Sequence, residues 1–100
     1  MKDDLLKIIS FYGVLPQLKH FNSEVFELNE AIIRKEIEYQ FCETTVKIDR
    51  ENLKHIVEEI ADCYVMLNQF QLYYGIENKQ IEETMKFKID RQLERLNKEN

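Results

Sequence analysis

Residues that interrupt helices are scarce in this chain, and their scarcity limits the folds available to it. Among 100 residues there are two glycines, Gly13 and Gly75, and one proline, Pro16. Sheet proteins need frequent turns, which these residue types favour, whereas long helices need few. The sequence therefore predicts an all-α fold, a bundle of about four helices.

Apolar residues at helical spacing define the first two predicted helices. The first covers about residues 2–12 and stops at Gly13, and the second has Pro16 in its first turn and runs to about residue 40. We expect their apolar stripes to be buried. These stripes consist of Leu5, Ile8, Ile9 and Tyr12 in the first helix and of Leu18, Phe21, Val25, Leu28, Ile32 and Ile33 in the second.

The third and fourth predicted helices fill most of the second half of the chain. The third covers about residues 50–74, with Asp49 as its N-cap and Gly75 just past its end, and Asn78 can cap the fourth. The residues between the second and third helices show no clear period and are expected to form a connection. The expected buried stripes are Ile56, Ile60, Cys63, Leu67, Phe70 and Tyr74, and then Ile81, Met85, Ile89, Leu93 and Leu96.

The balance of charges argues against a nucleic acid duplex as a partner. The chain has 19 acidic and 14 basic residues, a formal net charge of −5, which does not suit a surface that neutralises phosphates. Cys42 and Cys63 lack CxxC spacing, the first residues lack the pattern of a signal peptide, and no window approaches the roughly 18 apolar residues of a membrane span. We therefore expect a cytoplasmic protein with no membrane partner.

Two segments, LKHFNSEVFE from Leu18 and LKHIVEEIAD from Leu53, repeat one polar pattern on two predicted helices. Spacings of four and three place each set on one helical face, beside the apolar stripe. If the helices pack as antiparallel neighbours, four carboxylates converge. The two sets are His20, Glu24 and Glu27, and His55, Glu59 and Asp62.

Four converging carboxylates repel one another unless divalent cations bind or some of the acids are protonated. Carboxylate and water oxygens suit Mg²⁺ or Mn²⁺, whereas zinc favours histidine or thiolate and a di-iron site needs Glu-xx-His. Metal ions held in this way can in turn bind the phosphates of a nucleotide. Against this, an isolated ExxE pair usually lies on a solvated surface, and His20 and His55 fit packing or supporting roles better than metal ligation.

The stretches SEVFELNEAI, HIVEEIADCYVMLNQFQLYYGI and KFKIDRQLERL resemble the MazG-like nucleotide pyrophosphohydrolases of the all-α NTP pyrophosphatase superfamily, short bacterial and phage type. The family hallmark is EExxE on one helix and ExxD on the next. The second half is intact from Glu59 to Asp62, whereas Ser23 stands where the first acid of EExxE would be. The resemblance covers about residues 18–96 and implies that residues 1–100 form one MazG-like helical domain.

The resemblance implies Mg²⁺-dependent cleavage of a nucleoside triphosphate to a monophosphate and pyrophosphate, as housecleaning of the nucleotide pool. It also implies a homodimer or homotetramer. Lys88 and Arg91 would contact phosphate, although composition alone favours a solvated face for them. The carboxylates implied as catalytic and metal-binding are Glu24, Glu27, Glu59 and Asp62.

Several points stay open at the level of sequence. Ser23 cannot supply charge or act as a base at neutral pH, which puts the turnover and the identity of the general base in doubt. The main alternative is a non-catalytic helical assembly protein whose acids are solvated or bind metal structurally. The base preference is not indicated, because several aromatic residues could stack on a base. These include Phe11, Tyr12, Phe41 and Tyr73.

Overall fold

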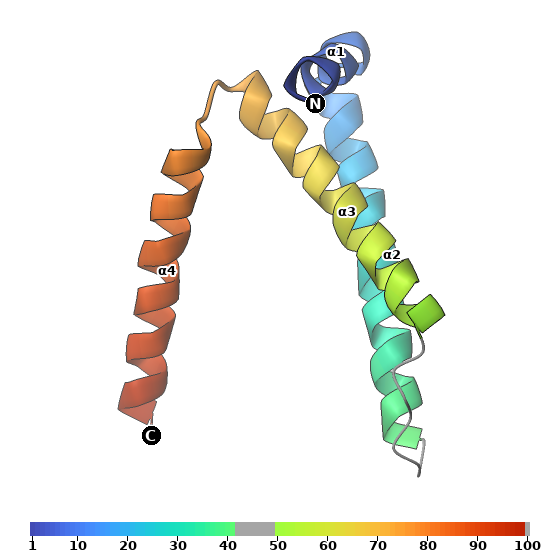
Figure 1. Ribbon diagram of the computed structural model, residues 1–100, viewed down its shortest axis with the longest axis vertical. Helices are drawn as coiled ribbons and strands as arrows, with labels where there is room; N and C mark the ends of the chain where they lie inside the picture. Colours follow the sequence, from blue (N-terminus) through green and yellow to red (C-terminus); the bar gives the residue numbers. More distant parts are fainter. Residues whose placement is uncertain (42–49, 100) are drawn as a thin grey trace.

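The computed structural model describes residues 1–41 and 50–99, which contain four helices and no strand. The all-α prediction is confirmed, and the helix ends lie close to those expected. The predictions for Cys42 and for Asp49 as an N-cap lie outside the described residues. The helices are α1 (Lys2–Tyr12), α2 (Val14–Phe41), α3 (Arg50–Tyr73) and α4 (Asn78–Glu99) (Figure 1).

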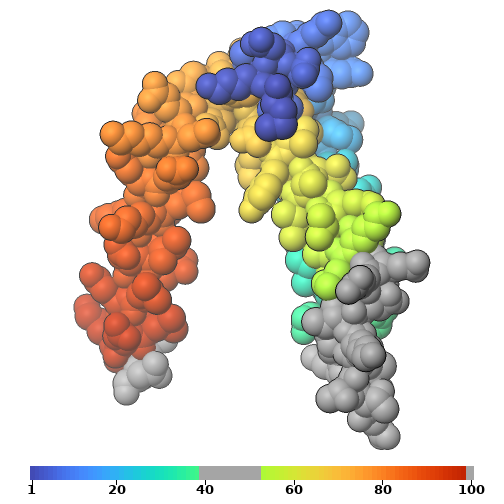
Figure 2. Space-filling view, viewed as in Figure 1, coloured from blue at the N-terminus to red at the C-terminus, as the bar shows by residue number. Residues whose placement is uncertain are grey.

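Three of the helices pack together and the fourth does not. Helices α2 and α3 run antiparallel and side by side, and α1 lies across one end of the pair, where it contacts both (Figure 1). Within the described residues α4 makes no packing contact with another helix, and Figure 2 shows it standing apart from α2 and α3. The bundle within one chain is therefore a three-helix unit with a projecting α4.

Both glycines end helices, as predicted. Gly13 has φ +91° and its N–H donates to the carbonyl of Ile9. Gly75 has φ +67°, in the left-handed region that a residue with a Cβ rarely adopts. The N–H of Gly75 donates to Leu72 and that of Ile76 donates to Gln71, which is the Schellman arrangement. The turn between α3 and α4 is thus encoded locally.

The start of α4 differs from the expected asparagine cap. Asn78 is the first residue of the helix, and its Oδ1 accepts a hydrogen bond of 2.7 Å from Nε2 of Gln71. The capping position belongs to Glu77, whose N–H donates to Oε1 of Gln80 at 2.9 Å. A glutamine three residues into the helix that reaches back to the cap N–H is half of a capping box. The amide of Asn78 instead ties α4 to the end of α3.

The seam between α2 and α3 is more polar than expected from the predicted apolar stripes. Of the residues expected to be buried in the first three helices, only Ile9 and Cys63 are buried. Those that are exposed instead are Ile8, Tyr12, Leu18, Ile32, Ile33, Ile60, Leu67 and Tyr74, and those that are only half-buried are Leu5, Phe21, Val25, Leu28, Ile56 and Phe70. Within one chain the predicted stripes are therefore covered only in part. Phe21 and Phe70, one from each stripe, meet edge-on across the seam with 5.9 Å between ring centroids, whereas the exposed members are not covered by the described helices.

The residues that do fill the seam are small or polar, apart from one methionine. Buried in α2 are Gln17, Ala31 and Lys35, and buried in α3 are Glu59, Cys63, Met66 and Gln69. The small side chains of Ala31 and Cys63 are consistent with close approach of the two helices. The seam thus places hydrogen-bonding and ionisable groups where a bundle normally has its apolar core.

Large apolar side chains are left on the surface. They include the whole predicted stripe of α4, which is at least 38% exposed at every position. An apolar helix face that is exposed along its whole length is uncommon on an isolated protein. In the part of the chain that the structure describes, no helix has the length and apolar character needed to cross a membrane.

Candidate metal centre

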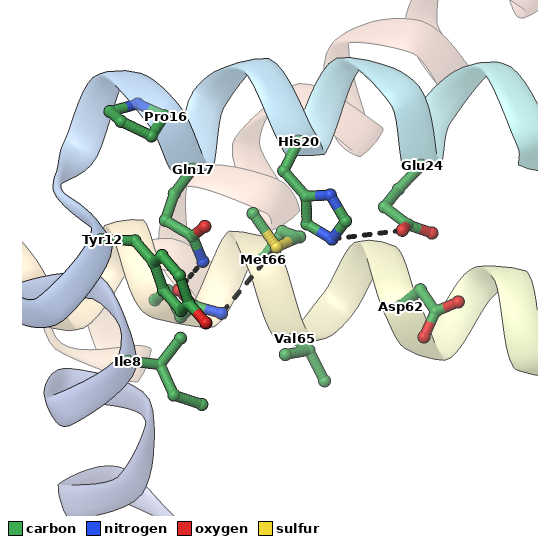
Figure 3. Close-up of a pocket in the computed structure, with 10 residues that line it drawn as sticks. Ile8, Tyr12, Pro16, Gln17, His20, Glu24, Asp62, Val65 and Met66 are labelled. Atoms are coloured by element: carbon green, nitrogen blue, oxygen red, sulfur yellow. Dashed lines mark hydrogen bonds and ion pairs between the residues drawn. The ribbon is translucent and has the colours of Figure 1, made fainter.

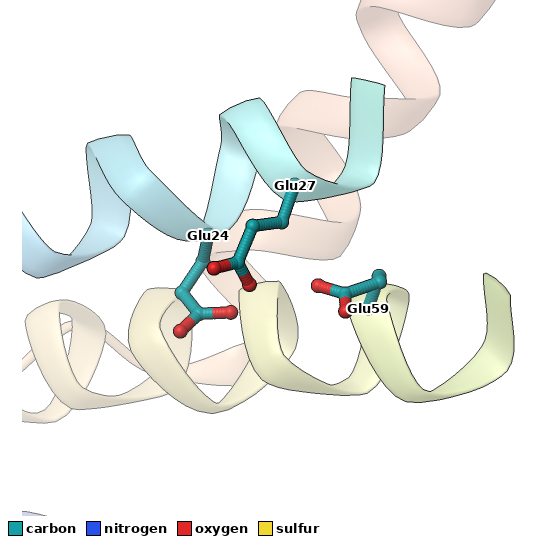
Figure 4. Close-up of side chains that lie close together, drawn as sticks. All are labelled: Glu24, Glu27 and Glu59. Atoms are coloured by element: carbon teal, nitrogen blue, oxygen red, sulfur yellow. The ribbon is translucent and has the colours of Figure 1, made fainter. Parts of the chain in front are cut away.

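Three of the predicted acids meet near the middle of the seam between α2 and α3. Glu24 and Glu27 lie one turn apart on α2, and Glu59 reaches them from α3 (Figure 4). One carboxylate oxygen of each lies within 4.8 Å of the others. The antiparallel packing of the two helices thus brings together three of the four carboxylates that the repeated sequence pattern predicted to converge, and Asp62 is not among them.

Two of these carboxylates each bury one oxygen atom without a hydrogen-bond donor. Glu59 is 8% exposed, and the side chain of Glu24 is 13% exposed. The Oε2 atoms of both are buried and have no hydrogen-bond partner in the described part of the chain. A buried ionised oxygen without a donor is costly, so the arrangement calls for a cation or a proton.

The pKa values of both buried glutamates are raised. Burial is the main cause for each, and neighbouring carboxylates add to it. After burial, the charge that most raises the pKa of Glu24 is Asp62, and the charge that most raises the pKa of Glu59 is Glu27. When protonated, Glu59 can also hydrogen-bond to Glu27, which raises its pKa further.

The fourth predicted acid, Asp62, lies at the edge of this group. It is exposed and lines the same cavity as Glu24 (Figure 3). Its charge raises the pKa of both Glu24 and Glu59, so it belongs to the same electrostatic cluster although it is not one of the three converging carboxylates.

Each buried glutamate has a histidine one turn earlier on its own helix. Nε2 of His20 lies 3.3 Å from Oε1 of Glu24, and Nδ1 of His55 lies 3.9 Å from Oε1 of Glu59. Both histidine side chains are more than half exposed. A protonated histidine lowers the pKa of its glutamate and so partly offsets the effect of burial. The two histidines therefore lie on the solvent side of the seam, and each is beside one glutamate.

Cys63 is buried close to the acids. Its thiol is free, and burial together with Glu24, Glu59 and Asp62 raises its pKa. A thiol that is harder to ionise is a poor nucleophile and a poor metal ligand. The structure thus agrees with its interpretation as a small apolar residue.

The other predicted site residues are not brought to the acids. Lys88 and Arg91 lie on α4 together with Gln92 and Arg95, around a shallow surface pocket. Since α4 does not pack on α2 or α3, no basic side chain of α4 is positioned by contacts with the acid cluster in one chain. Ser23, at the altered motif position, is exposed on α2.

Two buried glutamines near the acids were not indicated by the sequence. Nε2 of Gln17 donates to Oε1 of Gln69 across the α2–α3 seam at 2.8 Å. Both lie along a cavity of about 480 Å³ that also contains Glu24 and Asp62 (Figure 3). Glutamine is usually exposed in proteins, so the sequence alone does not indicate that these two glutamines are buried.

Comparison of the chain with protein-family models, with curated proteins and with solved structures found no match.

Proposed function

We propose that this chain is a divalent-metal-dependent nucleoside triphosphate pyrophosphohydrolase that acts in the cytoplasm. The observation that carries the proposal is the convergence of three carboxylates, of which Glu24 and Glu59 each hold a buried oxygen without a donor. The reaction is taken from the resemblance of the helix motifs to MazG-like enzymes. The housecleaning role is part of the same proposal.

The residues present fit a magnesium or manganese ion. All donors in the cluster are carboxylate oxygens, which these ions prefer, and the nearby thiol of Cys63 has a raised pKa that disfavours metal binding. Glu24, Glu27 and Glu59 would hold metal from within the seam, and Asp62 would do so from its edge beside Glu24. When bound, the metal neutralises charge on the phosphates and lowers the pKa of a bound water.

The chain's own residues would divide the remaining tasks. The carboxylates would hold the phosphates through the metal, and one carboxylate of the cluster would accept the proton of the attacking water. Water adds to the α-phosphorus, its proton passes to that base, and the bond to the bridging oxygen breaks. The products are the nucleoside monophosphate and pyrophosphate.

The proposal includes self-association into a homodimer or homotetramer. Apolar side chains of α4 such as Ile89 and Leu93 are about half exposed, and no helix of the described chain covers them. An interface with a second copy would bury them and would give α4 a defined position. Lys88 and Arg91 could then contact phosphate at the acids of a neighbouring chain.

The test is product analysis with Mg²⁺ and a panel of NTPs and dNTPs, scored separately for pyrophosphate and orthophosphate. We expect pyrophosphate and monophosphate, and at least about 100-fold less of both with Glu59→Gln, because even residues behind metal ligands contribute about 10- to 100-fold. Glu58→Gln is the matched control, since Glu58 is exposed on the neighbouring position of α3.

Absence of turnover with every nucleotide, using folded protein, would contradict the proposal. Magnesium-dependent stabilisation without turnover would then favour a helical assembly protein with a structural metal site. Equal turnover by wild type and Glu59→Gln would show that the observed activity does not come from this cluster.

A further inference from the structure

The cavity beside the acids continues well beyond them. From Glu24 and Asp62 it follows α2 and α3 to the end of α1, where Ile8 and Tyr12 form its far wall (Figure 3). Its volume of about 480 Å³ falls in the range of about 300–1,000 Å³ that is usual for small-molecule sites. The acids occupy only one end, so the other end has room for another part of a ligand.

The far end is lined by two glutamines whose side-chain amides do not use all their hydrogen-bonding groups on each other. Gln17 and Gln69 are 7% and 2% exposed, and one hydrogen bond joins them. Nε2 of Gln69 has the sulfur of Met66, at 3.8 Å, as its acceptor, and thioether sulfur is a weak one. Oε1 of Gln17 accepts no hydrogen bond from any described residue.

The amide pair thus presents one free acceptor and one weakly used donor. The oxygen and nitrogen of both amides can also be exchanged. The pair then still presents one acceptor and one donor, but Gln69 supplies the acceptor and Gln17 the donor. Because Oε1 of Gln17 is not a buried atom left without a partner, it is open to the cavity, where a ligand with a complementary donor and acceptor can use the amide pair. The polar edge of a nucleobase offers this combination.

An aromatic ring stands beside the amides. Tyr12, at the end of α1, lines the cavity and is 58% exposed (Figure 3). Its ring is nearly perpendicular to that of Phe11, with 4.9 Å between ring centroids, so that neighbour covers at most one of its faces. Exposed aromatic rings next to hydrogen-bonding groups are the usual means of holding a base.

We propose that the end of the cavity formed by Tyr12, Gln17 and Gln69 binds the nucleobase of the substrate. The amides hydrogen-bond to the edge of the base and the tyrosine stacks on it. This inference rests on the proposed function, which places the phosphates at the acids. Gln17 precedes Glu24 by seven residues on α2, about 10 Å along the helix axis, a separation that a ribose and a phosphate can bridge.

The first test observes the side-chain amides directly, without turnover. Metal-free protein labelled with ¹⁵N is titrated with nucleosides and their 5′-monophosphates, with ribose 5-phosphate as the ligand that lacks a base. We expect saturable shifts of the Gln17 and Gln69 amide signals with at least one base and none with ribose 5-phosphate. Gln71 is the internal control, because its amide bonds to Ile76 and Asn78 outside the cavity.

The second test separates stacking from general folding effects. Tyr12→Leu should weaken binding of the preferred base at least about tenfold, since stacking on one aromatic side chain has about that value or more. Tyr73→Leu is the matched control, because Tyr73 is similarly exposed but does not line the cavity. Equal weakening by both changes, or none with Tyr12→Leu, would overturn the proposal.

The two proposals fail in different ways. Pyrophosphate release without base-dependent shifts of the Gln17 and Gln69 signals would overturn the base site and leave the enzyme. Base-dependent shifts that are lost in Tyr12→Leu, without any turnover, would support the base site and overturn the hydrolase.

Discussion

Glu24 and Glu59 hold equivalent positions on two antiparallel helices. Each has a histidine one turn earlier beside its Oε1 and a buried Oε2 that no donor reaches within the described chain. The helix seam, which normally carries apolar side chains, here contains two carboxylates whose pKa values are raised. The metal-free fold therefore carries an electrostatic cost that neutral replacements should remove.

Glu59→Gln should stabilise the metal-free protein and destroy its response to magnesium. The neutral amide would have no charge to desolvate, so we expect the midpoint of thermal unfolding to rise, on the order of a few degrees. Added Mg²⁺ should raise the midpoint of the wild type and leave that of the variant nearly unchanged. Circular dichroism with and without EDTA measures both effects. A lower midpoint in the metal-free variant would mean that the carboxylate of Glu59 stabilises the fold. Glu58→Gln is the control for the effect of the same substitution at an exposed position of α3.

The stability of the metal-free protein should depend on pH through Glu24 and Glu59. Their folded pKa values lie above the ordinary 4.5, so the folded state binds more protons than the unfolded state between the two values. The contribution of these two groups to the free energy of unfolding is therefore greatest at low pH. It falls as the pH rises from about 4.5 through the folded pKa values. The difference in unfolding midpoint between Glu24→Gln/Glu59→Gln and the wild type should grow over this interval. A difference that is constant with pH would contradict the raised pKa values.

Each histidine should influence only the glutamate on its own helix. Removing His20 takes away the group that lowers the pKa of Glu24, so His20→Ala should raise that pKa further and leave Glu59 nearly unchanged. His55→Ala should do the reverse. Carboxyl ¹³C titration by NMR follows both groups in each variant. Equal effects of one histidine on both glutamates would show that the site titrates as a single unit.

The Gln17–Gln69 hydrogen bond should show strong coupling in a double-mutant cycle. Gln17→Leu leaves Oε1 of the buried Gln69 without its donor and should cost about 1–3 kcal/mol. In Gln17→Leu/Gln69→Leu no buried amide is left unpaired, so the double variant should be less destabilised than the sum of the single changes. Urea unfolding of the four proteins gives the coupling energy. Simple additivity would mean that the two amides act independently.

A charge on the apolar side of α4 should dissociate the proposed assembly. Leu93 is about half exposed in the single chain, and Leu93→Glu would place a carboxylate in the interface that we propose for it. We expect the molar mass from light scattering to fall toward that of one chain. Thr84→Glu adds the same charge at an exposed polar position on the opposite side of α4 and should have no such effect. An unchanged mass in both variants would place the interface elsewhere.

The helix ends were predictable from sequence because single residues determine them. Gly13 and Gly75 adopt positive φ, and Pro16 lies in the first turn of α2. The buried side of each helix was not predictable in the same way. Periodicity shows which side of a helix is apolar, but not what covers that side, and in this chain many apolar residues remain exposed.

The acid cluster was predictable because it depends on helical spacing and on antiparallel packing alone. The pairing of Gln17 with Gln69 depends on the exact register between two helices, to which the sequence offers no guide. The position of Lys88 and Arg91 likewise depends on where α4 lies. Within the described chain α4 packs along no other helix and is held at its start by the turn after Gly75 and the Gln71–Asn78 hydrogen bond. Features that depend on spacing within a helix were predictable from the sequence, whereas features that depend on how one helix lies against another in detail were not.

The isolation of α4 has a consequence for the kinetics of the proposed enzyme. If a second chain is what brings Lys88 and Arg91 to the phosphates, each catalytic unit contains parts of two molecules. Turnover per chain would then fall on dilution below the dissociation constant of the assembly, even at saturating nucleotide and metal. The concentration of the protein would become a control on its own specific activity.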